Sequence, residues 1–275
     1  MLYRCTRLLL TPLLRLLYRP VVRGRHHVPR RGPVILASNH LSFIDSVVIA
    51  LLSPRPVHFL AKDAYFQGRG VKGALVRCFF TAFGCIPVDR GGHRSAQASL
   101  EAAERVLADG RAFGIYPEGT RSPDGRLYRG RTGVAWLALT TGAPVVPVAL
   151  TGTDRLQPVG RRLPRYHRVT VEFGRPLRCP DPEPGGGRPA QLRRAATDEI
   201  IRRIGTLSGQ ERADAYATPP SSAPGPARAD VRGGGARWSL VRPRATGTPR
   251  PAPPSPVPAT GAPSRRRSRV PSRRR

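Results

Sequence analysis

The sequence predicts an α/β fold in which helices cover both faces of a mostly parallel central sheet. Two observations support this prediction. Runs of continuous apolar residues recur along the chain, and segments that repeat apolar residues at helical spacing lie between them. Strands that are apolar along their whole length are typical of sheets buried on both faces, and such sheets are usually parallel.

The predicted strands are short apolar runs that end in polar or turn-forming residues. The first four are "PVILAS" at 33–38, "VHFLAK" at 57–62, "CIPVD" at 85–89 and "AFGIYPE" at 112–118. Two more, "APVVPVALTG" at 143–152 and "RVTVEFG" at 168–174, follow each other without a predicted helix between them. Their β-branched and aromatic residues favour strands.

The predicted helices lie at 45–52, 71–84, 94–110, 132–142 and 189–205. Glycine commonly ends helices because it adopts the left-handed backbone conformation without strain. Gly84, Gly110 and Gly142 each stand at the end of one of these segments, which supports the predicted boundaries.

Composition divides the chain into three predicted parts. Residues 1–24 are rich in Leu and Arg, and residues 25–212 have the alternating pattern of one globular domain. Residues 213–275 are rich in Pro, Gly and Arg and contain few large apolar side chains. Too little apolar surface can be buried there to offset the entropy of ordering the chain, so this tail is predicted to be disordered.

The N-terminal stretch "MLYRCTRLLLTPLLRLLYRPVV" is apolar but is interrupted by arginines, so it does not read as a spanning helix. Its leucines at 9, 10, 13, 14, 16 and 17 favour one side of a helix. Such a helix can lie in the headgroup layer of a membrane, with arginines reaching lipid phosphates. It can equally pack on the core of its own domain, and the sequence leaves both readings open.

The chain carries 47 Lys and Arg against 17 Asp and Glu, for a formal net charge of +30. A balance of this kind indicates a polyanionic partner, either nucleic acid or an anionic membrane surface. The four cysteines, at 5, 78, 85 and 179, have neither a metal-binding spacing nor an evident disulfide pattern, which fits a reducing cytosol. The histidines are scattered, so no metal site is expected.

His40 and Asp45 follow the first predicted strand directly, in "SNHLSFID" at 38–45. If His40 lies in the turn and Asp45 in the first turn of the next helix, the carboxylate can reach the imidazole. That contact would orient the ring and leave its other nitrogen free to accept a proton from a hydroxyl group. The alternative is structural: Asp45 or Ser42 caps the helix, and His40 is an ordinary turn residue.

Two further strand ends place charged groups beside flexible backbone. In "YPEGTRSPDGRL" at 116–127, Glu118, Gly119, Thr120 and Arg121 offer a carboxylate, a flexible backbone, a hydroxyl and a guanidinium. In "GCIPVDRGGHRSA" at 84–96, Arg90 follows the end of a strand and precedes two glycines. Two arginines at such positions could clamp a phosphate, since ligands of α/β proteins bind at the carboxyl ends of strands. Ordinary surface turns with solvated charges are the alternative.

In this order, the three stretches resemble the motifs of the glycerolipid acyltransferase superfamily. His-x4-Asp follows a strand, a later strand ends in Val-Asp-Arg, and Glu-Gly-Thr-Arg-Ser comes next. A fourth block of the family, an apolar strand that contains a proline, matches "APVVPVALTGT" with its Pro147. The sequence is most similar to bacterial 1-acyl-sn-glycerol-3-phosphate O-acyltransferases, and the resemblance covers roughly residues 10–212.

The resemblance implies a single acyltransferase domain that works at the cytoplasmic face of the plasma membrane. His40 would be the general base and Asp45 the residue that orients it. Arg90, Gly119, Thr120 and Arg121 would bind the phosphate of a lysophospholipid, and Glu118 would organise their loop. The acyl donor would be acyl-CoA or acyl carrier protein, attacked directly by the acceptor, with no other cofactor and no metal.

Other functions remain possible on the sequence alone. The motifs do not distinguish a 1-acyl-sn-glycerol 3-phosphate acceptor from another lysophospholipid or a glycolipid. The Arg-rich tail could bind nucleic acid, but it lacks interleaved aromatic residues, so no specific nucleic-acid partner is expected. The stretch "GRGVKG" at 68–73 fits a dinucleotide-binding pattern, yet the preceding strand ends too early for that tight turn.

Overall fold

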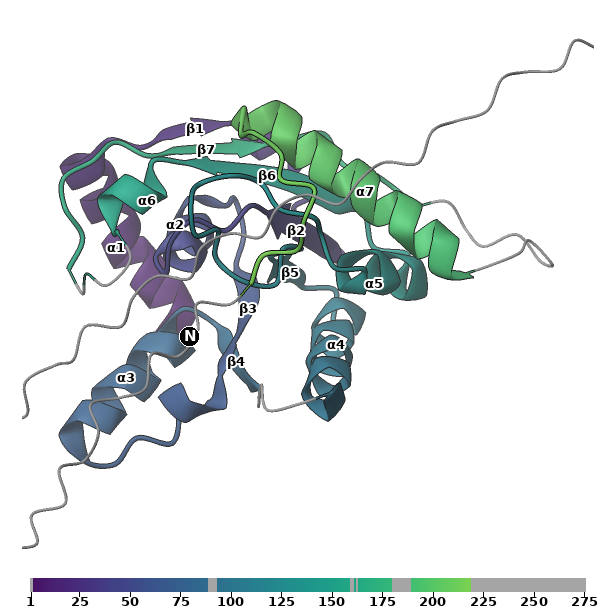
Figure 1. Ribbon diagram of the computed structural model, residues 1–275. Coiled ribbons are helices and arrows are strands. Elements are labelled where there is room, and N and C mark those ends of the chain that lie inside the picture. Colours follow the sequence, from purple (N-terminus) through teal and green to yellow (C-terminus); the bar gives the residue numbers. More distant parts are fainter. Residues whose placement is uncertain (1, 89–92, 159–160, 162, 180–188, 219–275) are drawn as a thin grey trace, which may run out of the picture. The chain divides into compact units, whose positions relative to one another are not determined.

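The computed structural model describes residues 2–88, 93–158, 161, 163–179 and 189–218 (Figure 1). Within these residues seven strands form one sheet, in the order β1-β7-β6-β2-β5-β3-β4. The strands are β1 (Val21–Arg23), β2 (Val34–Ser38), β3 (Val57–Lys62), β4 (Cys85–Val88), β5 (Ala112–Ile115), β6 (Val145–Thr151) and β7 (Thr170–Phe173). The strands predicted from the sequence are present, and β1 is an addition.

All neighbouring strands are parallel except β6 and β7. The described part of the connection between these two strands contains only the single-turn helix α6 (Thr153–Leu156). Parallel neighbours are usually joined by a helix that crosses the sheet, and the described residues of this connection contain no such helix; β7 runs antiparallel to β6. The mostly parallel sheet predicted from the sequence is confirmed.

Six longer helices pack around the sheet. They are α1 (Leu2–Tyr18), α2 (Asp45–Leu52), α3 (Gly70–Ala82), α4 (His93–Ala108), α5 (Gly133–Thr141) and α7 (Pro189–Ser208). Two short 3-10 turns, η1 (Arg25–His27) and η2 (Asp63–Tyr65), complete the described elements. Strand β1 and helix α6 were not predicted, because runs of three and four residues are too short to display a period.

Both faces of the sheet are covered, as the apolar strands predict. Val34 and Leu36 of β2 face a core shared with α1 and α2. The alternate residues Ile35 and Ala37 face a second core shared with α4, α5 and α7. This alternation follows from the two-residue period of a strand. Figure 1 shows α4, α5 and α7 on one side of the sheet and α1, α2, α3 and α6 on the other.

Helix α1 has two different faces. On its inner side Leu14 is buried, and the Tyr3 hydroxyl group contacts both the amide and the carbonyl group of Val57 in β3. On its outer side the leucines are exposed: Leu2, Leu8, Leu9, Leu13, Leu16 and Leu17. The prediction that the leucines share one side is therefore wrong for Leu10 and Leu14, which pack inward because the helical period turns them toward the core. The helix packs on the core and also exposes apolar surface.

The folded part of the chain extends beyond the predicted boundary at 212. The amide of Leu127 donates to the carbonyl of Glu211, and the amide of Ala213 donates back to Leu127. The amide of Arg129 donates to Ala215, and Ala217 is buried. Backbone pairing fixes these residues without help from large side chains, so composition could not reveal it. The remainder of the predicted tail, 219–275, lies outside the described residues. No helix in the described residues has the length and apolarity needed to cross a membrane.

Candidate active site

The candidate site lies at the carboxyl end of β2, in the middle of the sheet. Strands β6 and β5 flank β2 and run parallel to it, so the segments that leave β2 and β5 emerge at the same edge. The amide of Ser122, in the segment after β5, donates to the carbonyl of His40 over 2.8 Å. Strand β5 ends at Ile115, earlier than predicted, and so Tyr116 and Glu118 belong to this edge. Ligands of open α/β sheets bind at such edges.

His40 and Asp45 are in contact. The His40 Nδ1 atom lies 2.9 Å from Asp45 Oδ2, and the Asp45 side chain is fully buried at the start of α2. The same carboxylate oxygen accepts the amides of Leu41 at 2.7 Å and Ser42 at 2.8 Å. Because this oxygen acts as an acceptor for all its neighbours, the proton of the imidazole belongs on Nδ1. Asp45 thus both closes the turn and orients the ring.

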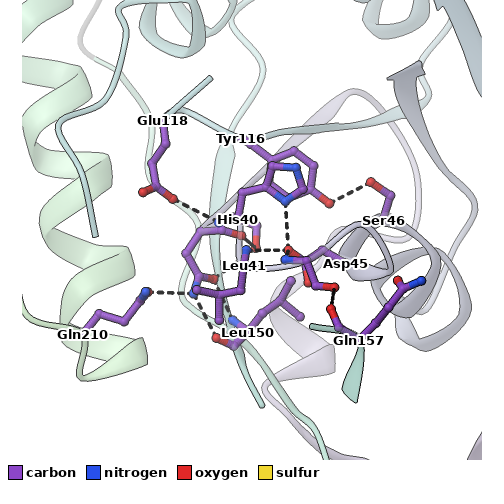
Figure 2. Close-up of polar contacts among 12 residues, drawn as sticks. His40, Leu41, Asp45, Ser46, Tyr116, Glu118, Leu150, Gln157 and Gln210 are labelled. Carbon is purple, nitrogen blue, oxygen red and sulfur yellow. Dashed lines mark hydrogen bonds and ion pairs between the residues drawn. The ribbon is translucent and has the colours of Figure 1, made fainter. Parts of the chain in front are cut away.

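The ring of Tyr116 packs on one face of the His40 imidazole. The two ring centroids lie 3.8 Å apart with their planes 11° from parallel, and the Tyr116 hydroxyl group lies 2.8 Å from Ser46 Oγ. Burial, and then the Asp45 carboxylate, raise the pKa of Tyr116 well above its usual value, so it remains a neutral phenol. Figure 2 shows the imidazole fixed between Tyr116 and Asp45. Among the described residues none forms a hydrogen bond with His40 Nε2, and the His40 side chain is 18% exposed.

Glu118 ties the segment after β5 to His40. Its Oε1 accepts the amide of His40 over 3.0 Å, and its Oε2 accepts the amide of Tyr128 over 2.9 Å. The side chain is fully buried, and burial raises the pKa of Glu118 to about 7 despite these two amide donors. Both oxygens face backbone amides, so the position of Glu118 fits the expected role of organising the loop.

Gly119, Thr120 and Arg121 follow Glu118 and are partly accessible. Gly119 has a φ of 78°, and a side chain there would also press against Arg131, since an added Cβ would lie 2.9 Å from Arg131 Cδ. The positive φ is the reason that glycine is favoured here, because the flexible Arg131 side chain could move aside. The half-buried Arg121 guanidinium forms no hydrogen bond or ion pair with another residue that the structure describes. Arg90 lies outside the described residues, just after β4 ends at Val88, and its role stays a prediction.

The structure adds hydrogen bonds of Asn39 and Gln210 that the motifs did not reveal. Asn39 is fully buried. Its Nδ2 donates to the carbonyl of Leu150 at 2.9 Å and to Gln210 Oε1 at 2.7 Å. Its Oδ1 accepts the amide of Leu150 at 2.8 Å. Gln210 in turn donates to the carbonyl of Gly125 over 2.6 Å. The segment after α7 thereby joins β2, β6 and the loop that carries Arg121 (Figure 2). Asn39 could have been suspected from its place beside His40, whereas no local pattern marks Gln210.

An α/β sheet that places a partly accessible histidine against a buried aspartate, at the end of its central strand, has the geometry of an enzyme active site. Comparison with known proteins shows which family the chain resembles. Residues 19–151 match the family model described as "Acyltransferase". Over these residues the chain is similar to this acyltransferase family, which is in general membrane-associated.

Individual relatives carry a more specific name. The chain is 32% identical over 134 residues to a 1-acyl-sn-glycerol-3-phosphate acyltransferase of Borreliella burgdorferi, an alignment that covers 49% of this chain and 52% of that relative. It is 27% identical over 192 residues to the enzyme of the same name from Bacillus subtilis, covering 69% and 88% of the two chains. The chain spans about half the length, or less, of several curated relatives that it matches.

The fold also matches a solved structure. The crystal structure of the 1-acyl-sn-glycerophosphate acyltransferase PlsC from Thermotoga maritima superposes with a TM-score of 0.55 and 25% sequence identity. The match covers 74% of this chain and 79% of that chain. The predicted α/β architecture is therefore confirmed, and the comparisons support the predicted family.

The raised pKa of Glu118 makes a prediction about stability. Between pH 4.5 and about 7 the native protein retains the Glu118 proton, whereas the unfolded chain releases it. The contribution of Glu118 to the free energy of unfolding should therefore fall as pH rises, by up to about 1.4 kcal/mol per pH unit. Urea unfolding of the native chain and of Glu118→Gln across this range measures the difference. Glu101→Gln, at an exposed position, is the reference for removing a surface carboxylate. A difference between the native chain and Glu118→Gln that stays constant with pH would contradict the assignment.

The two side-chain hydrogen bonds of Gln210 lead to a second prediction about stability. Gln210→Ala removes two hydrogen bonds and should lower the free energy of unfolding by about 1–2 kcal/mol. Gln210→Glu keeps an acceptor for Asn39 but places a carboxylate against the Gly125 carbonyl, so it should also destabilise the protein. Gln191→Ala, an exposed substitution in α7, is the matched control. Denaturant unfolding that gives equal stabilities for Gln210→Ala and Gln191→Ala would show that the link carries no stability.

Proposed function

We propose that this protein transfers a fatty acyl group from acyl-CoA or acyl carrier protein to the free hydroxyl of 1-acyl-sn-glycerol 3-phosphate, giving phosphatidic acid. The observation that carries the proposal is the contact between His40 Nδ1 and Asp45 Oδ2 at 2.9 Å beside a partly accessible imidazole edge. The names of the relatives from B. burgdorferi and B. subtilis support this acceptor. We place the reaction at the cytoplasmic face of the plasma membrane.

His40 acts as a general base in this proposal. The hydroxyl group of the acceptor donates its proton to Nε2 while its oxygen attacks the thioester carbonyl carbon. Asp45 accepts the hydrogen bond from Nδ1–H and stabilises the imidazolium that forms. The tetrahedral intermediate then expels the thiolate, and the imidazolium returns the proton to that sulfur. No acyl-enzyme forms, and no cofactor is needed, because the substrate supplies the nucleophile and the thioester supplies the leaving group.

Three features support the loop after β5 as the binding site for the acceptor's phosphate. Gly119 has no side chain, so its backbone can approach an anion closely. Thr120 offers a hydroxyl donor, and Arg121 offers a planar guanidinium that matches a phosphate. The buried Glu118 holds the loop against the backbone of His40, which keeps phosphate and hydroxyl of one acceptor within reach of the same site. Arg90 completes the phosphate clamp in this proposal.

A different acceptor within the same enzyme class is the second candidate. Another lysophospholipid or a glycolipid would present a hydroxyl group to His40 in the same way. Arg121 favours a phosphorylated acceptor over a neutral glycolipid, because its guanidinium has no acidic partner among the described residues. An assay that offers acyl-CoA with 1-acyl-sn-glycerol 3-phosphate, other lysophospholipids and glycolipids in parallel separates these possibilities.

His40→Ala should lower acyl transfer by roughly 10²–10⁴-fold, because it removes the positioned base. Asp45→Asn should lower it less, because the base remains but loses the acceptor that orients it. Release of free thiol from acyl-CoA measures the rate, and thermal unfolding shows that each variant is folded. The exposed-residue control His26→Ala should retain full activity. Folded His40→Ala protein that works within a few-fold of the native rate would exclude this role.

Arg121→Ala should weaken the use of the acceptor far more than the use of acyl-CoA. A charge-assisted hydrogen bond contributes about 1.5–3 kcal/mol, which corresponds to a rise of about 10- to 150-fold in the acceptor's KM. Arg90→Ala should act in the same direction. Arg126→Ala is the matched control, because Arg126 lies in the same loop but pairs with Asp124 at 2.7 Å. Equal changes in the KM values for both substrates would contradict the assignment.

A further inference from the structure

Most of the large exposed apolar side chains lie on helices α1 and α3, on one side of the sheet, whereas Tyr216 contacts Arg194 of α7. In the described residues these exposed side chains are Leu2, Leu8, Leu9, Leu13, Leu16, Leu17, Phe43, Tyr65, Val71, Leu75, Phe79, Leu163, Tyr166 and Tyr216. Those that belong to helices lie on α1 and α3. In the described side chains of α4, α5 and α7, which cover the other face, none is exposed. Scattered exposed leucines are ordinary, but a one-sided distribution of this kind marks a surface that contacts an apolar partner.

Helix α3 is apolar on two sides. Gly73 and Phe80 are buried against the domain. On the opposite side Val71 is 80% exposed, Leu75 66% and Phe79 41%, at the four-residue spacing that aligns side chains along a helix. The small residues between them, Ala74 and Cys78, are exposed as well. A continuous apolar stripe on the solvent side of a helix is typical of a surface that contacts an apolar partner.

The exposed stripe belongs to a helix that is fixed to the domain. Gly73 packs so closely on Gly68 that an added Cβ would lie 2.2 Å from the Gly68 carbonyl carbon. The Arg77 guanidinium donates to the same carbonyl group, and the ring of Phe80 stacks on Tyr65 with centroids 4.5 Å apart. Helix α3 is therefore fixed on the domain, and the exposure of Leu75 does not come from fraying of the helix.

The charges around the stripe indicate which apolar partner it fits. The segment 69–82 contains Arg69, Lys72 and Arg77 and no acidic residue, and Arg69 and Lys72 are exposed. Helix α1 likewise contains arginines and no acidic residue. An apolar side bordered only by cations is the pattern of a helix that lies in the interface of an anionic bilayer, with Lys and Arg at the phosphates. Thirteen residues of α3 are too few to span a bilayer.

The stripe also leads to the candidate active site. Phe43, which is 41% exposed, lies in the turn that begins at His40. Its ring packs edge-on against Phe80 of α3 at 6.2 Å and against Tyr65 at 6.4 Å. The ring contacts of Phe43 with Phe80, and of Phe80 with Phe79, therefore connect the turn that carries His40 with the outer side of α3. A bilayer that contacts α3 would lie next to this turn.

We propose that α3 is a membrane-binding helix, in addition to α1, and that its Val71, Leu75 and Phe79 side chains insert into the interface of an anionic bilayer. The two helices pack against each other near Tyr3 and Gly84, so they form two membrane contacts on one side of the domain. When both helices contact the bilayer, the turn from His40 to Phe43 faces the lipid surface. The inference concerns binding and does not depend on which lipid is the acceptor.

Co-sedimentation of the full chain with mixed phosphatidylcholine and phosphatidylglycerol vesicles tests the proposal. The double variant Val71→Ser/Leu75→Ser removes the apolar stripe and should weaken partitioning by about tenfold or more. The matched variant Val71→Ile/Leu75→Met keeps the apolar area and should bind like the native chain. Val71 and Leu75 are both exposed, so neither variant should change the temperature of thermal unfolding. In α1, Leu8→Ser/Leu16→Ser should weaken binding independently, and combining it with the α3 pair should weaken binding further.

Two results would overturn the proposal. In the first, the serine pair in α3 partitions like the native chain while the serine pair in α1 releases the protein, which would leave α1 as the membrane contact. In the second, the serine pair leaves vesicle binding intact but abolishes binding to purified acyl carrier protein, which would make α3 a protein-docking surface. Vesicle binding is measured without acyl transfer, so its outcome is separate from that of the proposed reaction.

Discussion

The rest of the site depends on the three hydrogen bonds that Asp45 Oδ2 accepts, from His40 Nδ1 and from the amides of Leu41 and Ser42. A buried carboxylate is costly unless its oxygens are satisfied. Here the turn that satisfies one oxygen is the turn that positions the imidazole. Loss of the ring contact would leave Asp45 with two amide donors, and loss of the turn would remove all three.

Further buried groups extend this arrangement to neighbouring elements. Glu118 joins the loop after β5 to the backbone of His40, and Asn39 joins β2 to β6 and to the segment after α7. Each uses backbone amides or carbonyls that would otherwise be unpaired in the interior. The raised pKa of Glu118 shows that burial outweighs its two amide donors, so order in this loop is obtained at some cost in stability at high pH.

Much of the fold could be predicted because its signals are local. The strand at 57–62 and the helix at 45–52 have the predicted boundaries, since apolar runs and helical spacing are properties of neighbouring residues. His40 and Asp45 could be paired because they are only five positions apart in the sequence. Tyr116 and Gln210 could not be placed, because their partners are distant in the sequence and reach them only through the tertiary fold. The two directions of the α1 leucines depend in the same way on what the helix packs against.

The central claim is that Asp45 fixes His40 with the proton on Nδ1 and leaves Nε2 free to accept a proton. Nitrogen NMR of histidine-labelled protein tests it most directly, with the His40 signals assigned by their absence in His40→Ala. The account predicts that neutral His40 is protonated at Nδ1 and unprotonated at Nε2, and that Asp45→Asn reduces this preference. A neutral His40 protonated at Nε2 in the native protein would contradict the account.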